Sequence, residues 1–527
     1  MVLILLILEV NIMKLERRRN SLKGTAWGVI KTTSNIIGPF IIRTLIIYKL
    51  SAEYAGLNSL FTSILSILSL TELGFSQAIV YSMYKPIAED NISQVCALLR
   101  LYRFVYKIIG SIILLAGILV APFLKVIIKD DMPNDINLYI LYFIFLFNTV
   151  ISYFSFAYKT SILSAYQRED IVCRNYTLVN LILYIFQGIV ISICSNYYYY
   201  VLLIPVSTIA LNIINAYAVD KYYPELICQG TIGQDTIFEL KKQVCGLMIW
   251  KIGSATRNTL DNIIISIYFG LTSVTIYNNY YIIMSGVIGM LGVVTSSIRA
   301  GIGNKIAISS VEENYCDFNK FQFMYCWIAG MCTICLACLY QPFMSIWMGR
   351  KLMLDNGTMF LICLYFFILK IGDINSTYYQ AAGLWWHGRY RSIVESLLNI
   401  ILNLTLGYYF GVTGIVAATI ISIVLVWFYG SGIIFWNYFT KHSVKEYYLQ
   451  CGLYLTVTFT SCCIIYMVCE CLINDLYFKK WEVFLIRLFV CLMLSNLFFW
   501  IVYHKTDNYK KARNFARATV KIFGGKI

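Results

Sequence analysis

Apolar segments alternate with short polar connections along almost the whole chain. Each apolar segment holds about 20 residues or more, the length that an α-helix needs to cross the hydrocarbon core of a bilayer. Apolar run length and polar breaks predict about fourteen transmembrane helices. These spans are 25–47, 54–82, 104–126, 137–158, 175–195, 198–219, 244–269, 275–302, 321–347, 357–383, 392–411, 413–436, 451–473 and 482–503. The pattern therefore predicts an all-α polytopic membrane protein.

Composition supports this fold class. Hydrophobic residues make up 59% of the 527 and charged residues only 13%, whereas a soluble domain has about 45–50% and about 25%. The net charge is +15, but most lysines and arginines fall in short connections on one side of the predicted spans. The positive-inside rule explains them better than nucleic-acid binding does. It predicts that both termini are cytoplasmic.

A weak internal repeat predicts two lobes. Trp27 matches Trp250 and Tyr54 matches Tyr277 at the same offset, and both matches fall in helices of the same orientation. Such a parallel repeat predicts two six-helix lobes followed by two further helices. The predicted divisions are a cytoplasmic N-terminal segment 1–24, a first lobe 25–219, a cytoplasmic loop 220–243, a second lobe 244–436, the last two helices in 451–503 and a basic cytoplasmic tail 504–527.

The first residues leave the start of the chain open. Residues 1–12 are apolar but lack the positive n-region and the small-residue cleavage site of a signal peptide. The basic sequence MKLERRRNSLKG begins at Met13 and is a suitable cytoplasmic start. Both Met1 and Met13 are therefore candidate initiators.

Charged side chains inside the predicted spans mark the candidate site. A charge at the centre of a spanning helix costs about 2.5–3.5 kcal/mol, so such residues are expected to face a wet cavity or another helix. Cations outnumber the acids Asp261 and Asp373 in these helices, and an anion such as a phosphate or diphosphate is expected to bind there. The basic residues concerned are Lys251, Arg257, Arg299 and Lys370.

Structural explanations stay open for several of these charges. Arg257 and Asp261 are spaced for an i,i+4 ion pair within one helix. Arg299 lies near a helix end, from which its side chain can extend to the membrane interface. Stripes of Ser, Asn, Thr and Gly on the same helices are typical of helix–helix contacts.

Motifs of enzymes and metal sites are missing from the sequence. It contains no GxxxxGK[ST] phosphate-binding loop and no predicted outer loop long enough for a catalytic domain. Of the 17 cysteines, Cys332, Cys335 and Cys338 have CxxCxxC spacing, but their segment is apolar and has no nearby His or carboxylate. We therefore expect packing cysteines, no metal and no cofactor, and a protein that is not an enzyme.

Two segments resemble a known family of transporters. The sequence from Asn20 to Asn91, with its basic NSLKG start and the passages FIIRTLIIYKLSAEYAGLNSLF and ELGFSQAIVYSMYKPIA, resembles the N-terminal region of bacterial Wzx-type polysaccharide repeat-unit flippases. The sequence IYFGLTSVTIYNNYYII (Ile267–Ile283) resembles the family's connection between the seventh and eighth helices. This family belongs to the MOP superfamily, together with MATE drug exporters and MurJ lipid II flippases.

The resemblance implies a function as well as a fold. It implies two lobes around a cavity that opens alternately to each side of the bacterial cytoplasmic membrane. The substrate would be an undecaprenyl-diphosphate-linked oligosaccharide for capsule, O-antigen or exopolysaccharide assembly, and a polymerase and glycosyltransferases would be partners. A cationic cavity would include Arg43, unless that side chain extends to the outer interface. Candidates for coupling to H⁺ or Na⁺ are Glu72, Asp261, Asp373 and Glu395.

Three other functions are alternatives to this one. A MATE-like antiporter of organic cations would need a cavity dominated by carboxylates and aromatic rings, which the excess of cations disfavours. A lipid II flippase stays open, because the sequence does not identify the sugar. A membrane glycosyltransferase or polymerase would need acid, base or metal-binding residues in a sizeable loop, and no such loop is predicted.

Overall fold

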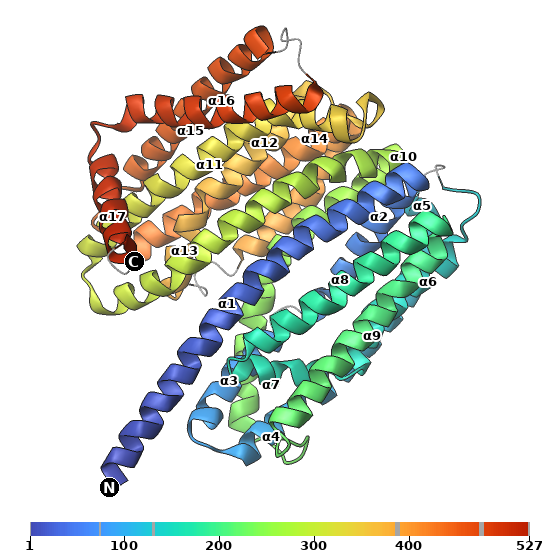
Figure 1. Cartoon of the computed structure of the whole chain (residues 1–527), viewed down its shortest axis with the longest axis vertical. Helices are drawn as coiled ribbons and strands as arrows, with labels where there is room; N and C mark the ends of the chain where they lie inside the picture. Colours follow the sequence, from blue (N-terminus) through green and yellow to red (C-terminus); the bar gives the residue numbers. More distant parts are fainter. Residues whose placement is uncertain (1, 73–74, 129–131, 385–389, 474–478, 525–527) are drawn as a thin grey trace. The chain divides into compact units, whose positions relative to one another are not determined.

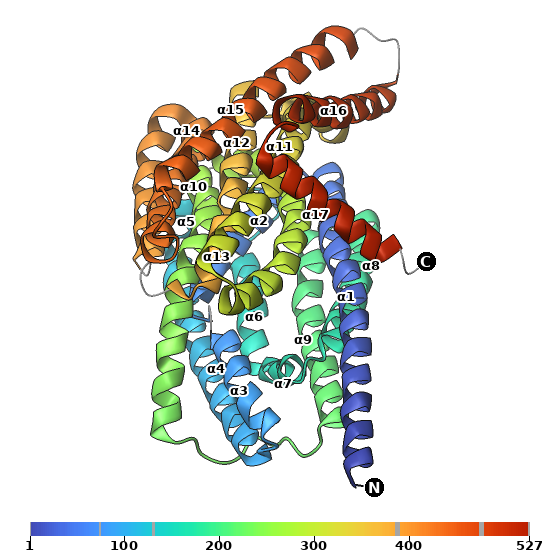
Figure 2. The same cartoon turned by 90° about the vertical axis from the view of Figure 1, so that its left-hand side faces the viewer.

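The structure is a computed structural model that describes residues 2–72, 75–128, 132–384, 390–473 and 479–524. It is 88% helical, with no strand in the described part of the chain (Figures 1 and 2). Among these residues, 9 helices are long and apolar enough to cross a membrane, or 10 if a bent pair counts as one span. The predicted fold class, an all-α polytopic membrane protein, is confirmed.

The chain divides into two compact units, Met1–Thr275 and Ile276–Ile527. We call them unit 1 and unit 2. The α-helices before the boundary are α1 (Val2–Lys49), α2 (Ala52–Leu68), α3 (Phe75–Ala88), α4 (Ile92–Val120), α5 (Leu124–Ile127), α6 (Leu138–Phe154), α7 (Thr160–Ala165), α8 (Glu169–Ile193) and α9 (Tyr197–Tyr222). The long α10 (Gln234–Ile308) crosses the boundary.

Unit 2 contains the second half of α10 and all later helices. These are α11 (Val311–Trp347), α12 (Asn356–Ile371), α13 (Asp373–Ala381), α14 (Arg391–Asn437), α15 (Val444–Val468), the π-helical turn η6 (Cys469–Ile473), α16 (Lys480–Tyr503) and α17 (Asp507–Gly524). Short 3-10 turns in the two units include η1 (Ser69–Glu72) and η4 (Arg350–Leu352).

Two of the long helices are each bent at a glycine. Gly270 in α10 has φ 78° and ψ 178°, and Gly411 in α14 has φ 67° and ψ −149°. A positive φ is strained for residues with a side chain but open to glycine. The breaks fall between the predicted spans 244–269 and 275–302 and at the end of the predicted span 392–411. Each of these two helices therefore contains two of the spans that the sequence predicts.

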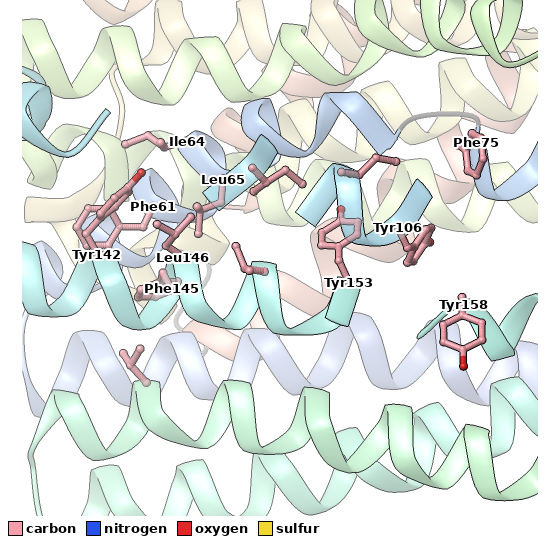
Figure 3. Packing of buried hydrophobic residues seen from close by; sticks show 14 of the residues in the cluster. Phe61, Ile64, Leu65, Phe75, Tyr106, Tyr142, Phe145, Leu146, Tyr153 and Tyr158 are labelled. Carbon is pink, nitrogen blue, oxygen red and sulfur yellow. The ribbon is translucent and has the colours of Figure 1, made fainter. Parts of the chain in front are cut away.

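The core of unit 1 is aromatic where α2, α4 and α6 meet (Figure 3). The ring of Phe61 lies 5.7 Å from that of Tyr142 and 5.5 Å from that of Phe145. Gly117 in α4 allows the close approach, because a Cβ there would come within 2.4 Å of Leu146 in α6. The Tyr142 hydroxyl donates a hydrogen bond to the Gly117 carbonyl at 2.9 Å. This packing holds the helices that form one wall of the candidate site.

The first half of α10 packs against α2, within unit 1. Thr275 Oγ1 donates to the Ala52 carbonyl at 2.6 Å, and Asn262 Nδ2 donates to Ser63 Oγ at 2.9 Å. A Cβ on Gly56 would lie 2.4 Å from the Leu271 carbonyl oxygen. The boundary between unit 1 and unit 2 therefore follows Thr275, after the seventh predicted span (244–269). The two six-helix lobes, which rest on the sequence repeat, stay a prediction.

Replacing Gly56 by alanine tests this contact. The added methyl group would meet backbone, which cannot rotate away, so we expect overpacking to cost about 1–3 kcal/mol of unfolding free energy. The measurement is the melting temperature of the purified protein in detergent. Gly28→Ala is the control, since nothing lies within 4 Å of a Cβ there. Equal melting temperatures for the two variants would contradict the packing described.

Candidate functional site

Unit 1 contains a polar cavity of 430 Å³, which we call the Arg43 cavity. Helices α1, α2, α6, α8 and α9 provide its walls. Hydroxyl, amide and guanidinium groups make up its polar lining, and no carboxylate is among the described lining residues. The polar residues are Arg43, Asn58, Thr62, Ser66, Ser69, Asn148, Thr149, Asn180, Tyr184, Gln187 and Tyr200.

Arg43 is the charged group of this cavity, and its side chain is only 7% exposed. Its guanidinium donates one hydrogen bond to Ser59 Oγ at 3.0 Å and another to the Thr275 carbonyl at 3.2 Å. Ser59 in turn donates to the Ala55 carbonyl at 3.0 Å, so its oxygen is held toward Arg43. These bonds hold the buried guanidinium at the cavity wall. The Arg43 side chain therefore does not extend to the membrane interface, which is the alternative that the sequence leaves open.

Glycine and tyrosine shape the rest of this wall. A Cβ on Gly38 in α1 would lie 2.2 Å from the Tyr184 ring of α8, so the glycine admits that ring. On α9, the rings of Tyr197 and Tyr200 lie 5.4 Å apart, and the Tyr197 hydroxyl donates to the Tyr54 carbonyl at 3.1 Å. Aromatic faces beside hydroxyl and amide groups suit the apolar faces and hydroxyl edges of a sugar.

The other predicted cations have different surroundings. Lys251 and Arg257 belong to α10, but their side chains lie outside the described residues. Arg299 is exposed, on the second half of α10. Lys370 is 5% exposed, and its ammonium lies 2.7 Å from Asp373 Oδ2. The positive charge of Lys370 is therefore already paired with a carboxylate. Substrate binding by these residues stays a prediction.

Two of the predicted acidic residues accept hydrogen bonds from tyrosine hydroxyls. In unit 1, Glu72 accepts from Tyr106 of α4 and Tyr153 of α6, both at 2.5 Å. In unit 2, Asp373 accepts from Tyr325 of α11 at 2.5 Å, in addition to its contact with Lys370. These donors offset part of the cost of placing a carboxylate among apolar helices.

The other two predicted acidic residues are buried, Asp261 in unit 1 and Glu395 in unit 2. Asp261 is 0% exposed in α10, next to Asn262, and Glu395 is 5% exposed in α14. On the same stripe as Glu395, the Asn399 amide donates to Thr419 Oγ1 and Ser422 Oγ, both at 3.2 Å. The uncharged part of that stripe thus joins the two halves of α14, as expected for a helix–helix contact.

A second cavity, of 470 Å³, lies between α11, α12 and α15 in unit 2. Its lining is almost wholly apolar and offers no charged group. The lining residues are Thr333, Ala337, Gly357, Phe360, Leu361, Cys363, Leu364, Phe367, Leu455, Thr458, Phe459, Cys462, Cys463, Tyr466 and Met467. A charged head group would lose its hydration there without compensation. Of the Arg43 cavity and this apolar cavity, the Arg43 cavity is the one suited to an anion.

The fold defines a class of protein. The structure is similar to that of the lipid II flippase MurJ in an inward closed conformation, with a TM-score of 0.63 and 16% identity over 91% of this chain and 99% of that one. It is also similar to an inward-facing MATE multidrug resistance transporter of the MOP superfamily, with a TM-score of 0.59 and 11% identity over 76% and 96%. No family model matches the sequence, and neither does any curated protein.

A Vibrio cholerae MATE transporter gives a TM-score of 0.56 at 11% identity, over 81% of this chain and 98% of that one. These similarities span nearly the whole of each related structure, so they concern the complete architecture. The chain therefore has the fold shared by MurJ and the MATE transporters. It is a multi-pass membrane protein of the MOP fold.

The contacts around Glu72 can be tested by a double-mutant cycle. Residues that share a hydrogen bond usually show coupling energies of about 0.5–3 kcal/mol. We therefore expect Glu72→Gln and Tyr153→Phe to be non-additive by that amount. The measurement is the unfolding free energy in detergent, titrated with a denaturing detergent.

Tyr142→Phe is the matched control for this cycle. Its hydroxyl donates to the Gly117 carbonyl, so its effect should add to that of Glu72→Gln within experimental error. Additivity for Tyr153→Phe as well would show that the carboxylate and the Tyr153 hydroxyl do not interact.

Proposed function

We propose that this protein is a flippase that moves an undecaprenyl-diphosphate-linked oligosaccharide across the cytoplasmic membrane of a bacterium. It would work by alternating access and supply capsule, O-antigen or exopolysaccharide assembly. The MOP fold supports a transporter, and the sequence resemblance to Wzx-type flippases supports this substrate. Both termini would be cytoplasmic, and a polysaccharide polymerase and glycosyltransferases would act on either side of this step.

The observation that carries the proposal is the charge of the Arg43 cavity. Its described lining combines one buried guanidinium with hydroxyls, amides and tyrosines, and contains no carboxylate. A guanidinium matches phosphate oxygens in geometry and charge. The neutral polar groups can replace water around sugar hydroxyls, while a polyprenyl tail can stay in the hydrocarbon.

The same observation weighs against the main alternative. A MATE-like exporter of organic cations needs negative charge where the cation binds, and Arg43 would repel it. A lipid II flippase is a closer alternative, because the MurJ neighbour carries that name and covers 91% of this chain. A cavity that binds a lipid-linked diphosphate would suit both substrates. The two flippases would therefore differ in the sugar that they accept.

A transport assay in proteoliposomes tests the proposal. The substrate is a fluorescent undecaprenyl-diphosphate oligosaccharide, and the readout is the rate at which it becomes accessible to a quencher in the opposite leaflet. Loss of a charged hydrogen bond to the diphosphate would cost about 1.5–3 kcal/mol. We expect Arg43→Ala to reduce the initial rate roughly tenfold to a hundredfold, and Arg43→Lys to reduce it less.

Arg350→Ala serves as the control, because Arg350 is an exposed arginine in η4 and should leave the rate unchanged. Lipid II offered to the same vesicles tests the closer alternative. Transfer of lipid II in preference to the oligosaccharide substrate would replace the proposal by that one. Efflux of a cationic dye that depends on Asp261 or Asp373, without transfer of either lipid, would support a cation antiporter instead.

Ion coupling is the second part of the proposal. A carboxylate that accepts hydrogen bonds from several helices can lose those partners when the helices rearrange, and a proton or Na⁺ can then neutralise it. Glu72, Asp373, Asp261 and Glu395 are the candidates, and the first two have tyrosine donors from other elements.

We expect Glu72→Gln to abolish any acceleration of transfer by a proton or sodium gradient, while exchange without a gradient continues. The reason is that the amide cannot gain or lose a proton. The measurement compares initial rates with and without an imposed gradient of each ion. Glu53→Gln, in the first turn of α2, is the control. An unchanged gradient response in Glu72→Gln would exclude that residue as the coupling site.

A further inference from the structure

Three buried cysteines from separate parts of unit 2 meet at one point. Cys338 lies in α11, Cys469 begins the π-helical turn η6, and Cys491 lies in α16. Their three sulfur atoms all lie within 4.8 Å of one another, and Cys469 Sγ and Cys491 Sγ are 3.9 Å apart. Each of the three is 0% exposed. We call this group the three-thiol cluster.

The separation of the Cys469 and Cys491 sulfurs matches that of thiolates that share a metal ion, and the Cys338 sulfur lies within 4.8 Å of both. Two sulfurs bound at about 2.3 Å to the same ion are about 3.8–4.0 Å apart in tetrahedral or trigonal geometry. Cys469 and Cys491 already have this separation. In the described part of the chain, no other set of His, Cys, Asp or Glu groups converges in this way. A hydrogen bond between the Cys469 and Cys491 thiols would give the same 3.9 Å separation. Close packing of small apolar side chains accounts for buried cysteines one by one, but not for a third thiol, that of Cys338, within 4.8 Å of both.

Two further features distinguish this site. The guanidinium of Arg487, one helical turn before Cys491 on α16, donates to Glu470, the residue after Cys469, at 3.0 Å. This bond joins η6 to α16 next to the two cysteines. The turn that carries Cys469 is π-helical, a rare geometry that is frequent at functional sites.

We propose that the three-thiol cluster binds a soft, thiophilic, monovalent cation, for which Cu(I) is the natural probe. Thiolate donors select Cu(I) over hard ions. Structural zinc takes four ligands, and the cluster offers three among the described residues. Each sulfur that binds as a thiolate releases its proton to the solvent, so affinity rises with pH. Cys471, two residues after Cys469, is exposed, so its thiol can bind the ion at the protein surface before the ion reaches the cluster.

This site is independent of the proposed transport function. The sequence predicted no metal site, because the CxxCxxC segment with Cys332, Cys335 and Cys338 is apolar and has no nearby His or carboxylate. The structure places only Cys338 of these three in the cluster. The ion would link α11 to the C-terminal pair α15 and α16, and so stabilise that part of unit 2.

The test uses the full-length protein, reduced and without oxygen, in detergent. Cu(I) is added with a chromophoric Cu(I) chelator in competition, and the copper kept by the protein is measured by elemental analysis. We expect one ion per chain in the wild type. Cys338→Ala and Cys469→Ala should each lower the affinity about tenfold or more, since even changes outside the ligand set cost that much.

Cys363→Ala is the matched control, because Cys363 is a buried cysteine of α12 outside the cluster. Each variant must elute as a single species before loading. Cu(I) should raise the melting temperature of the wild type and of Cys363→Ala, but not that of Cys469→Ala. Equal copper retention by the wild type and Cys338→Ala, or the same loss in Cys363→Ala, would overturn the proposal.

Two further outcomes would also decide against it. Displacement of Cu(I) by equimolar Zn(II) would contradict the soft, three-coordinate assignment. A disulfide between Cys469 and Cys491 in freshly isolated protein, seen by mass spectrometry of alkylated peptides, would remove two of the three donors. The proposal requires that all three cysteines are found as free thiols, that is, alkylated and without a disulfide.

Discussion

The cost of an unpaired polar group in hydrocarbon governs this structure. Each backbone N–H or C=O left without a partner in lipid costs several kcal/mol, and only helices satisfy all of these groups within one segment. The described parts of the chain are accordingly 88% helical, without a strand. The same cost applies to side chains, so Arg43, Glu72 and Lys370 are found with hydrogen-bond partners from the protein. Polar residues in the spans thus determine which helix faces meet.

The surroundings of Lys370 and Arg43 differ in a way that bears on function. Lys370 and Asp373 neutralise each other, and a neutral pair exerts little long-range attraction on an anion. Arg43 instead lines a cavity whose other polar groups are hydroxyls and amides, with no carboxylate among the described lining residues. A guanidinium beside neutral polar groups complements a diphosphate and its sugars. This lining, rather than the number of cations in the spans, makes the Arg43 cavity the better candidate for a diphosphate.

The sequence predicted the helices and their breaks better than the partners of its polar residues. Hydrophobic run length is a local property, and it predicted the interruptions near Gly270 and Gly411. It also singled out Asp373 as a costly charge, whereas Glu72 was named as a coupling candidate alongside the family resemblance. It missed Tyr106, Tyr153 and Tyr325, because a tyrosine in an apolar segment resembles an ordinary packing or interface residue. Their partners lie 34, 81 and 48 residues away, and only tertiary structure reveals such contacts.

The two units share an arrangement that the weak repeat in the sequence does not show. Corresponding helices α4 and α11 begin at Ile92 and Val311, and Tyr106 and Tyr325 follow these starts by the same number of residues. Both tyrosines donate to a carboxylate, but the acceptor comes from η1 in unit 1 and from α13 in unit 2.

This difference makes the two carboxylates respond unequally to a movement of helices. Lys370 precedes Asp373 by three residues, so the ion pair stays together when α11 moves. Both tyrosine donors to Glu72 come from other helices, α4 and α6, and Glu72 has no ion pair with the described residues. Separating these helices from η1 would remove both donors, and the half-buried carboxylate would then take up a proton or a cation more readily. A rearrangement within unit 1 would therefore be linked to ion binding at Glu72 more strongly than one in unit 2 is linked to Asp373.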